Sequence, residues 1–296
     1  MKKNLLPLII ILFCQSFTLG QDIEDTLTIY GRDRFYRIHL PLGYNYQNKY
    51  PVVFVFHGGL GSPDNVERMA KLTEKADKEG FVVIYPYGTG PFDKKLLTWN
   101  TWECCGYAHK KNIDEIEYVK SILMEIKEKF SVDSTMIFAT GISNGGMMCY
   151  LLACELSNEF AAIAPVVATM FDENQCDSDS ELSMVIFNSL DDKHIPYEGG
   201  IGEESIVQVD KMPVEKVVDF WTKRFNCSFV NKSEAESYHK ITFKNQSETE
   251  IVFYRMLSGG HSWPGGEKGR LLADRPVKDV SATDIIWEFF KNHPKH

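Results

Sequence analysis

The residue in this chain best suited to act as a nucleophile is a serine set between glycines. Residues 141–145 read GISNG, a G-x-S-x-G pattern that follows an apolar, β-branched segment and precedes an apolar segment of helical type. Between a strand and a helix, this pattern predicts a nucleophile elbow, in which Ser143 sits on a tight turn with its hydroxyl exposed. A glycine-rich turn with a surface serine is the alternative, and the flanking elements favour the elbow.

A serine hydroxyl is a weak nucleophile at neutral pH and needs a general base, commonly a histidine held by a carboxylate. Around a nucleophile elbow, the acid and then the histidine follow the serine along the chain. Five histidines follow Ser143, and His261 comes after a predicted strand on the glycine-rich loop SGGHSWPGG (258–266). We therefore predict His261 as the base. His194 follows too closely behind the candidate acids to occupy a separate loop.

The acid is expected after the strand SMVIFNSL (183–190), where two aspartates are adjacent. Either Asp191 or Asp192 could reach the imidazole, and periodicity does not choose between them. Two adjacent acids in a loop are also typical of a solvated turn. The need for an acid after this strand raises both as candidates.

Attack on a carbonyl also requires N–H donors for the oxygen that becomes negative. One donor is expected from the residue after the nucleophile, Asn144, and another from the loop after an early strand. The segment FHGGLGS (56–62) ends such a strand, so Gly59 and Leu60 are the candidates. His57 precedes the serine and is expected to brace this loop.

The elements that must position these residues follow from the alternation of apolar β-branched runs with amphipathic segments. This pattern predicts an α/β fold with a mostly parallel, doubly wound sheet flanked by helices, preceded by two antiparallel strands. Strands are expected at 26–30, 35–41, 50–59, 81–88, 134–141, 160–168, 183–190 and 249–257, and helices at 63–78, 113–130, 142–156, 213–225 and 281–293. No linker or repeat divides the chain, so one catalytic domain is expected over residues 21–296.

The N-terminal residues indicate the compartment of the chain, and its net charge bears on which partners it can bind. Residues 1–20 combine Lys2 and Lys3 with an apolar run too short to span a bilayer, which predicts a cleaved signal peptide and a secreted chain without membrane insertion. The formal net charge is −9. An acidic chain without a basic patch is a poor nucleic-acid binder.

The cysteines fit an oxidising compartment. Seven are present, and six remain once Cys14 of the leader is removed. No C-x-x-C pair or histidine at ligand spacing points to a metal, so we expect structural disulfides, whose pairing the sequence leaves open, and no metal or organic cofactor.

With these pieces placed, the chain resembles secreted polyhydroxybutyrate depolymerase-like esterases, close to the feruloyl and acetylxylan esterases of carbohydrate esterase family 1. The resemblance covers nearly the whole mature chain. The segments that carry it are HGG (57–59), WNTWECCG (99–106), IDEIEYVKSIL (113–123), ATGISNGGMMCYLLACE (139–155), FAAIAPVVA (160–168), DKHIPYEGG (192–200), GGHSWPGG (259–266) and SATDIIWEFFKNHP (281–294).

This resemblance implies an α/β-hydrolase fold with a Ser-His-Asp triad. The family acid stands five residues before a tyrosine, here Tyr197, which selects Asp192. Trp263 would line the substrate pocket, and Trp99 or Trp102 would add an aromatic wall, with core packing as the alternative for these side chains.

Two departures from the family accompany these matches. Cys227 lacks the later cysteine with which relatives pair it, so that bridge is in doubt. FNSLDD (187–192) stands where relatives have HGTAD, which changes the residues beside the acid but removes no triad member.

The sequence thus predicts a secreted serine carboxylesterase that works through an acyl-enzyme. Feruloyl or acetyl esters of plant polysaccharide are the expected substrates. Three alternatives remain open: a hydroxyalkanoate oligomer depolymerase, an acyltransferase of the same fold, and a catalytically inactive hydrolase fold used for binding.

Overall fold

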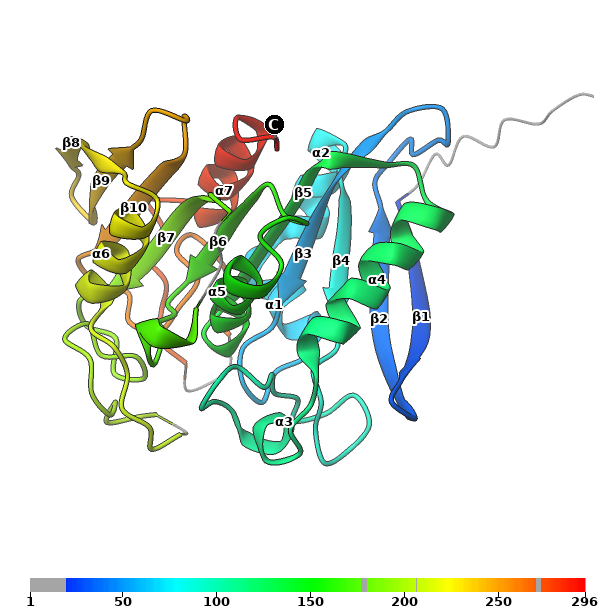
Figure 1. The fold of residues 1–296 in the computed structure, drawn as a ribbon, viewed down its shortest axis with the longest axis horizontal. Helices are drawn as coiled ribbons and strands as arrows, with labels where there is room; N and C mark the ends of the chain where they lie inside the picture. The colour runs from blue at the N-terminus through cyan, green and yellow to red at the C-terminus, as the bar shows by residue number, and fades with distance from the viewer. Residues whose placement is uncertain (1–19, 177–179, 206, 270–272, 296) are drawn as a thin grey trace, which may run out of the picture.

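The computed structural model describes residues 20–176, 180–205, 207–269 and 273–295. The predicted leader therefore lies, apart from Gly20, outside the described residues. One ten-stranded sheet runs through the molecule in the order β1-β2-β4-β3-β5-β6-β7-β10-β9-β8 (Figure 1).

The six central strands are parallel, as predicted. Most of their residues are buried, which explains why they read as continuous apolar runs rather than as an alternating pattern. They are β3 (Tyr50–Phe56), β4 (Val82–Pro86), β5 (Val132–Ile142), β6 (Ala162–Val166), β7 (Ser183–Ser189) and β10 (Glu250–Met256).

Antiparallel hairpins extend both edges of this sheet. The predicted early pair is β1 (Gln21–Ile29) and β2 (Arg32–Leu40), which joins the sheet through β4. The opposite pair is β8 (Ser228–Glu234) and β9 (Tyr238–Lys244), which joins the sheet through β10. Every residue of β8 is exposed, so no hydrophobic alternation marks it in the sequence.

Helices cover both faces of the sheet (Figure 1). The first hydrophobic core lies under α4 (Glu115–Lys129), α5 (Asn144–Glu155) and α6 (Val214–Arg224). The second core lies on the other face, under α1 (Pro63–Ala70), α2 (Leu72–Glu79) and α7 (Ala282–Lys291). None of the described helices combines the length and apolar character needed to cross a membrane.

Local sequence signals explain most helix ends, with one correction. Ser281 caps α7 as predicted, because its hydroxyl accepts a hydrogen bond from the N–H of Asp284. The single helix expected over residues 63–78 is instead two helices. Lys71 separates them in a left-handed conformation (φ 54°), and its N–H donates to the carbonyl of Glu67 to close the first helix. The short α3 (Gly106–Lys110) was not predicted either.

Four of the six cysteines form disulfides, as expected from their number. Cys154 pairs with Cys176, and the adjacent Cys104 and Cys105 form a vicinal disulfide. Cys149 and Cys227 are free thiols, so the doubt about a bridge at Cys227 is justified in the part of the chain that the structure describes.

Candidate active site

Ser143 occupies a strained turn between β5 and α5. Its backbone has φ 58° and ψ −124°, a conformation that few residues other than glycine adopt. The neighbouring Gly145 lies so close to β3 that a methyl group on it would overlap the carbonyl groups of Phe56 and His57. The glycines of the GISNG motif therefore allow the helix to begin directly at the serine.

His261 and Asp192 are hydrogen-bonded, with 2.8 Å between Nδ1 of the ring and Oδ2 of the carboxylate. The second carboxylate oxygen accepts the backbone N–H groups of His194 and Ile195 at 2.8 and 2.9 Å. Burial by itself would raise the pKa of Asp192, but the nearby His261 ring and these N–H donors outweigh it and hold the pKa below its usual value. The carboxylate is thus kept ionised beside the imidazole.

Two further aspartates hold the histidine loop through its backbone. Asp191 accepts the N–H of Gly260 at 2.8 Å, and Asp274 accepts the N–H of His261 at 2.7 Å. The two adjacent acids predicted after β7 therefore differ in their contacts. Asp192 touches the imidazole ring, whereas Asp191 fixes the loop that carries it.

Ser143 and His261 line one cavity of about 690 Å³. The residues predicted to stabilise the oxyanion line the same cavity, namely Gly59, Leu60 and Asn144. Leu60 has a positive φ of 58°, and a turn closed from the Gly61 N–H to the Gly58 carbonyl (3.0 Å) shapes this loop. Asn144 begins α5, so its backbone N–H has no acceptor one turn earlier in the helix.

The side chain of Asn144 ties the elbow to the loop that follows β4. Its Oδ1 accepts the backbone N–H of Trp99 at 2.8 Å, and its Nδ2 donates to the hydroxyl of Thr101 at 3.1 Å. The indole N–H of Trp99 donates in turn to the carbonyl of His57 at 2.8 Å. His57 accepts the N–H of Gly88 at 3.0 Å and packs against Trp99, with 4.8 Å between ring centroids and 35° between planes, so it braces this region as expected.

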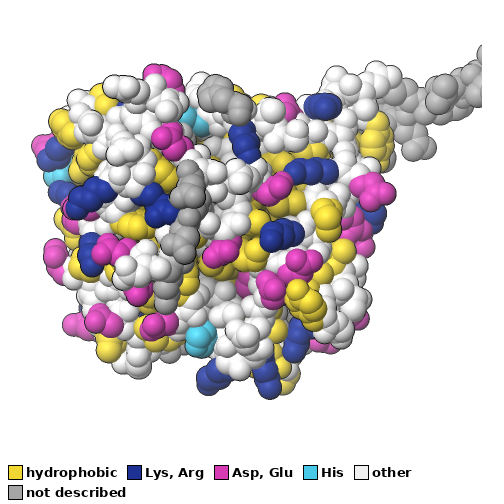
Figure 2. Space-filling model, in the orientation of Figure 1, with side chains coloured by type: hydrophobic (Ala, Val, Ile, Leu, Met, Phe, Trp, Pro, Cys, Tyr) yellow, Lys and Arg dark blue, Asp and Glu magenta, His cyan; other side chains and the backbone are white. Residues whose placement is uncertain are grey.

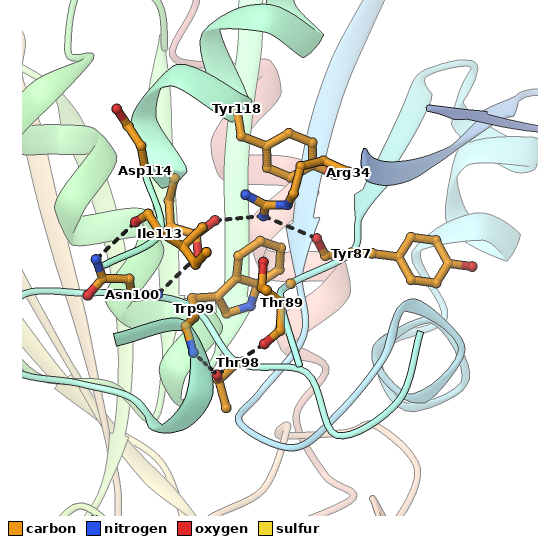
Figure 3. Close-up of polar contacts among 12 residues, drawn as sticks. Arg34, Tyr87, Thr89, Thr98, Trp99, Asn100, Ile113, Asp114 and Tyr118 are labelled. Atoms are coloured by element: carbon orange, nitrogen blue, oxygen red, sulfur yellow. Dashed lines mark hydrogen bonds and ion pairs between the residues drawn. The ribbon is translucent and has the colours of Figure 1, made fainter. Parts of the chain in front are cut away.

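A buried ion pair fixes the same loop from its other side (Figure 3). Arg34 and Glu115 contact each other at 2.8 Å, and their side chains are 3% and 0% exposed. Glu115 also accepts the backbone N–H of Asn100 at 3.1 Å, while the guanidinium lies 3.8 Å from the ring centroid of Tyr118. The strand β2, the helix α4 and the loop beside the nucleophile are thereby joined.

The three predicted pocket tryptophans require correction. Trp99 and Trp263 are completely buried, and the cavity is not lined by either of them or by Trp102. The indole N–H of Trp263 donates to the hydroxyl of Thr283, within the core under α7. Trp102 is half-buried and packs against the other core. Core packing, the alternative for these aromatics, describes their positions.

His194, which the sequence excludes as the general base, lines the cavity. Its ring stacks on that of His261, with 4.6 Å between centroids and 16° between planes. Burial, followed by the proximity of His261, lowers the pKa of His194 below its usual value. His194 shares the loop of Asp192, as its spacing predicts, and this loop places the His194 ring against that of His261.

Asp192, His194 and His261 carry potential metal-ligand atoms within 4.8 Å of one another, a group found within the described ranges. Imidazole nitrogens bind a metal through lone pairs in the ring plane. The two rings are nearly parallel, so their lone pairs lie in separate planes and do not converge on one ion. This arrangement fits proton transfer through His261 better than coordination.

The fold and the family are shown by comparison with known proteins. An acetyl xylan esterase from Aspergillus awamori superposes with a TM-score of 0.61 at 14% identity, covering 91% of this chain and 99% of that one. The fold is that of the α/β hydrolases, as predicted. The sequence model described as "Putative esterase" matches residues 28–265, so the chain belongs to this family.

Two curated relatives have related names. Feruloyl esterase B of Piromyces equi is 24% identical over 78% of this chain, which corresponds to only 43% of that protein. The chain thus spans less than half the length of this relative. Probable feruloyl esterase C of Aspergillus niger is 25% identical over 88% of this chain and 84% of its own length.

Proposed function

We propose that the chain is a serine carboxylesterase with Ser143, His261 and Asp192 as its triad. The observation that carries this proposal is the hydrogen bond from the His261 ring to buried Asp192, in the cavity that Ser143 also lines. The Nδ1 contact leaves Nε2 as the nitrogen available to the serine hydroxyl. The strained elbow at Ser143 is the second support.

The reaction proceeds by acyl transfer to the serine. Nε2 of His261 takes the proton of Ser143 as Oγ bonds to the carbonyl carbon, and the backbone N–H groups of Asn144 and of Gly59 or Leu60 stabilise the resulting oxyanion. The C–O bond to the alcohol then breaks, and His261 returns the proton to the leaving oxygen. Water, deprotonated by His261, attacks the carbonyl carbon of the acyl-enzyme; the bond to Oγ then breaks, His261 returns the proton to Ser143, and the acid is released. Asp192 holds the tautomer and stabilises the imidazolium.

Feruloyl or acetyl esters of plant polysaccharide are the proposed substrates. The support comes from the names of the relatives and from the cavity, which is apolar near Met69, Ile142 and Met147 but polar near Glu204 and Lys211. A saccharide alcohol suits the polar end. The hydroxyalkanoate oligomer, the acyltransferase reaction and an inactive binding role remain as alternatives.

We propose that residues 21–296 form one catalytic domain and that the chain is secreted after loss of its leader. The two disulfides favour an oxidising compartment. Acidic and basic side chains are interspersed on the face shown in Figure 2, so the described part of this face carries no continuous basic surface for nucleic acid.

The test is ester hydrolysis by the purified mature chain and by Ser143→Ala. The panel contains methyl ferulate, acetylated xylan, a hydroxybutyrate oligomer and p-nitrophenyl acetate. Ser233→Ala is the matched control, because Ser233 lies on the exposed edge strand β8. Hydrolysis that disappears only in Ser143→Ala supports the proposal. Turnover that survives this substitution, or its absence on every ester, refutes it, and a preference for an alcohol acceptor over water selects the acyltransferase.

A further inference from the structure

One wall of the cavity is built from sulfur. Cys104 and Cys105, which form the vicinal disulfide, line it together with Met147. We infer that this sulfur wall, defined by these three residues, binds the aromatic ring of the substrate's acyl group. The inference rests on the proposed esterase function and names the part of the molecule that selects the acyl group.

The sulfur wall is fixed relative to the nucleophile. Met147 is one helical turn after Ser143, whose carbonyl accepts its N–H at 2.9 Å. Thr101 donates its hydroxyl to the Met147 sulfur at 3.8 Å, and the N–H of Cys104 donates to the Thr101 carbonyl at 2.9 Å. The N–H of Cys105 donates to the carbonyl of Trp99 at 3.0 Å. The disulfide is therefore held by the same segment that hydrogen-bonds Asn144.

The order of strands decides which part of an ester meets this wall. Ser143 follows β5, the acid and the histidine follow β7 and β10 on one side of it, and Cys104 and Cys105 follow β4 on the other side. The histidine must deliver a proton to the leaving alcohol, so the alcohol lies on the β7 and β10 side. The sulfur wall lies on the opposite side, towards β3 and β4, so it is placed to meet the acyl group rather than the alcohol.

The two sides of the cavity differ in the corresponding way. On the alcohol side, the lining includes His194, Glu204, Ser205 and Lys211, which suit hydroxyl groups. On the acyl side, the lining includes the sulfur wall, Leu60 and Met69, together with the polar residues Asn65 and Thr98. Sulfur contacts aromatic rings favourably, with a gain in binding of about 2- to 12-fold for each contact. An aromatic acyl group therefore fits this side better than an acetyl group does.

A purely structural role explains this disulfide less well. A bridge stabilises a fold by constraining the unfolded chain, and the effect grows with the number of residues enclosed. Cys104 and Cys105 are adjacent, so their bridge encloses almost no chain, whereas Cys154–Cys176 spans 22 positions. The position of the vicinal pair on the cavity gives it a use that chain stabilisation does not.

The test compares Cys104→Ser/Cys105→Ser with the matched control Cys154→Ser/Cys176→Ser, whose cysteines do not line the cavity. Three esters separate the two ends of the substrate: methyl ferulate has an aromatic acyl group, benzyl acetate an aromatic alcohol, and ethyl acetate has neither. We expect the ratio of kcat/KM for methyl ferulate to that for ethyl acetate to fall about 2- to 12-fold in the first variant only. The ratio for benzyl acetate to ethyl acetate should not change.

An unchanged ferulate ratio in the first variant overturns the inference. So does an equal fall in the control, or a fall confined to benzyl acetate. If the first variant does not fold, Met147→Leu replaces the third sulfur of the wall with hydrocarbon of similar size. A fall in the ferulate ratio of about 2- to 12-fold is again expected, and an unchanged ratio refutes the inference.

Assays of the wild-type chain distinguish failure of the sulfur-wall inference from failure of the proposed esterase function. Hydrolysis of ethyl acetate without hydrolysis of methyl ferulate, and without competitive inhibition by ferulate, refutes the sulfur wall but leaves the esterase standing. Failure on all three esters refutes the esterase itself.

Discussion

The carboxylate of Asp192 makes three hydrogen bonds, and the substitution Asp192→Asn would affect them unequally. Oδ1 accepts two backbone N–H groups, so the amide oxygen of an asparagine must occupy this position. The amide nitrogen would then face Nδ1 of His261, 2.8 Å away in the native contact. Because both groups would be donors, the ring must move its proton to Nε2. In that tautomer Nε2 cannot accept the proton of Ser143.

We expect kcat to fall about 10,000-fold, which corresponds to about 5.5 kcal/mol of transition-state stabilisation. The opposite orientation of the amide would place its NH₂ group against two N–H donors, so rotation of the side chain does not rescue the variant. Steady-state hydrolysis of methyl ferulate or p-nitrophenyl acetate measures the effect. KM should change much less than kcat, since the carboxylate lies behind the imidazole.

Asp191→Asn is the matched control, one residue away. Asp191 accepts hydrogen bonds from the N–H of Gly260 and from the hydroxyl of Ser189, and an amide oxygen still accepts from both. We expect a loss of less than about 10-fold in kcat, since a neutral acceptor replaces a charged one. If Asp191→Asn is the more damaging of the two, the assignment of the acid to Asp192 is refuted.

Three other predictions use the burial and contacts described above. The pKa of Asp192 is lowered in the folded state, so its ionisation stabilises the fold above the ordinary aspartate pKa. This contribution is lost as the pH falls from about 4 through the lowered pKa. Urea midpoints measured from pH 6 to pH 3 should therefore fall less steeply in Asp192→Asn than in the wild type. Arg34→Met leaves Glu115 as an unpaired buried charge and should lower the free energy of unfolding, measured with urea, by about 3–5 kcal/mol. A decrease below about 1 kcal/mol would contradict the burial of this ion pair. Trp99→Phe removes an indole hydrogen bond next to the loop proposed to hold the oxyanion, and should lower kcat rather than raise KM. Trp263→Phe should lower the melting temperature with little effect on KM. A raised KM in either variant would indicate that the tryptophan contacts the substrate.

Much of the fold was predictable because its signals are local. The parallel strands are short apolar runs, and the elbow motif lies between one of them and a helix, so Ser143 and His261 could be placed by their order along the chain. Asp192 could not be separated from Asp191 by periodicity. Both follow the same strand, β7, and their contacts differ because of how the loop turns after it. The choice came from the resemblance to a family, and the contact with His261 agrees with it.

The residues that were misplaced depend on contacts between distant segments. An exposed aromatic wall and a buried brace have the same sequence signature, namely a tryptophan near a predicted site. Trp99 is a brace because Asn144 and His57 supply partners for its backbone and indole N–H groups. Similarly, the ring of His194 stacks on that of His261 because their loops follow the neighbouring parallel strands β7 and β10 at the same edge of the sheet. These relations arise from packing and leave no periodic signal.

The segment 99–105 links the selection of substrate to the position of the nucleophile. Trp99 hydrogen-bonds Asn144 beside Ser143, and the same short stretch carries Cys104 and Cys105 to the cavity. A change that moves the sulfur wall should therefore also act on the proposed oxyanion donor Asn144, because the side chain of Asn144 is hydrogen-bonded to this segment. The reverse also follows: a change that keeps this segment in place but replaces its sulfur atoms should alter the preference among acyl groups and leave the chemistry of the serine intact.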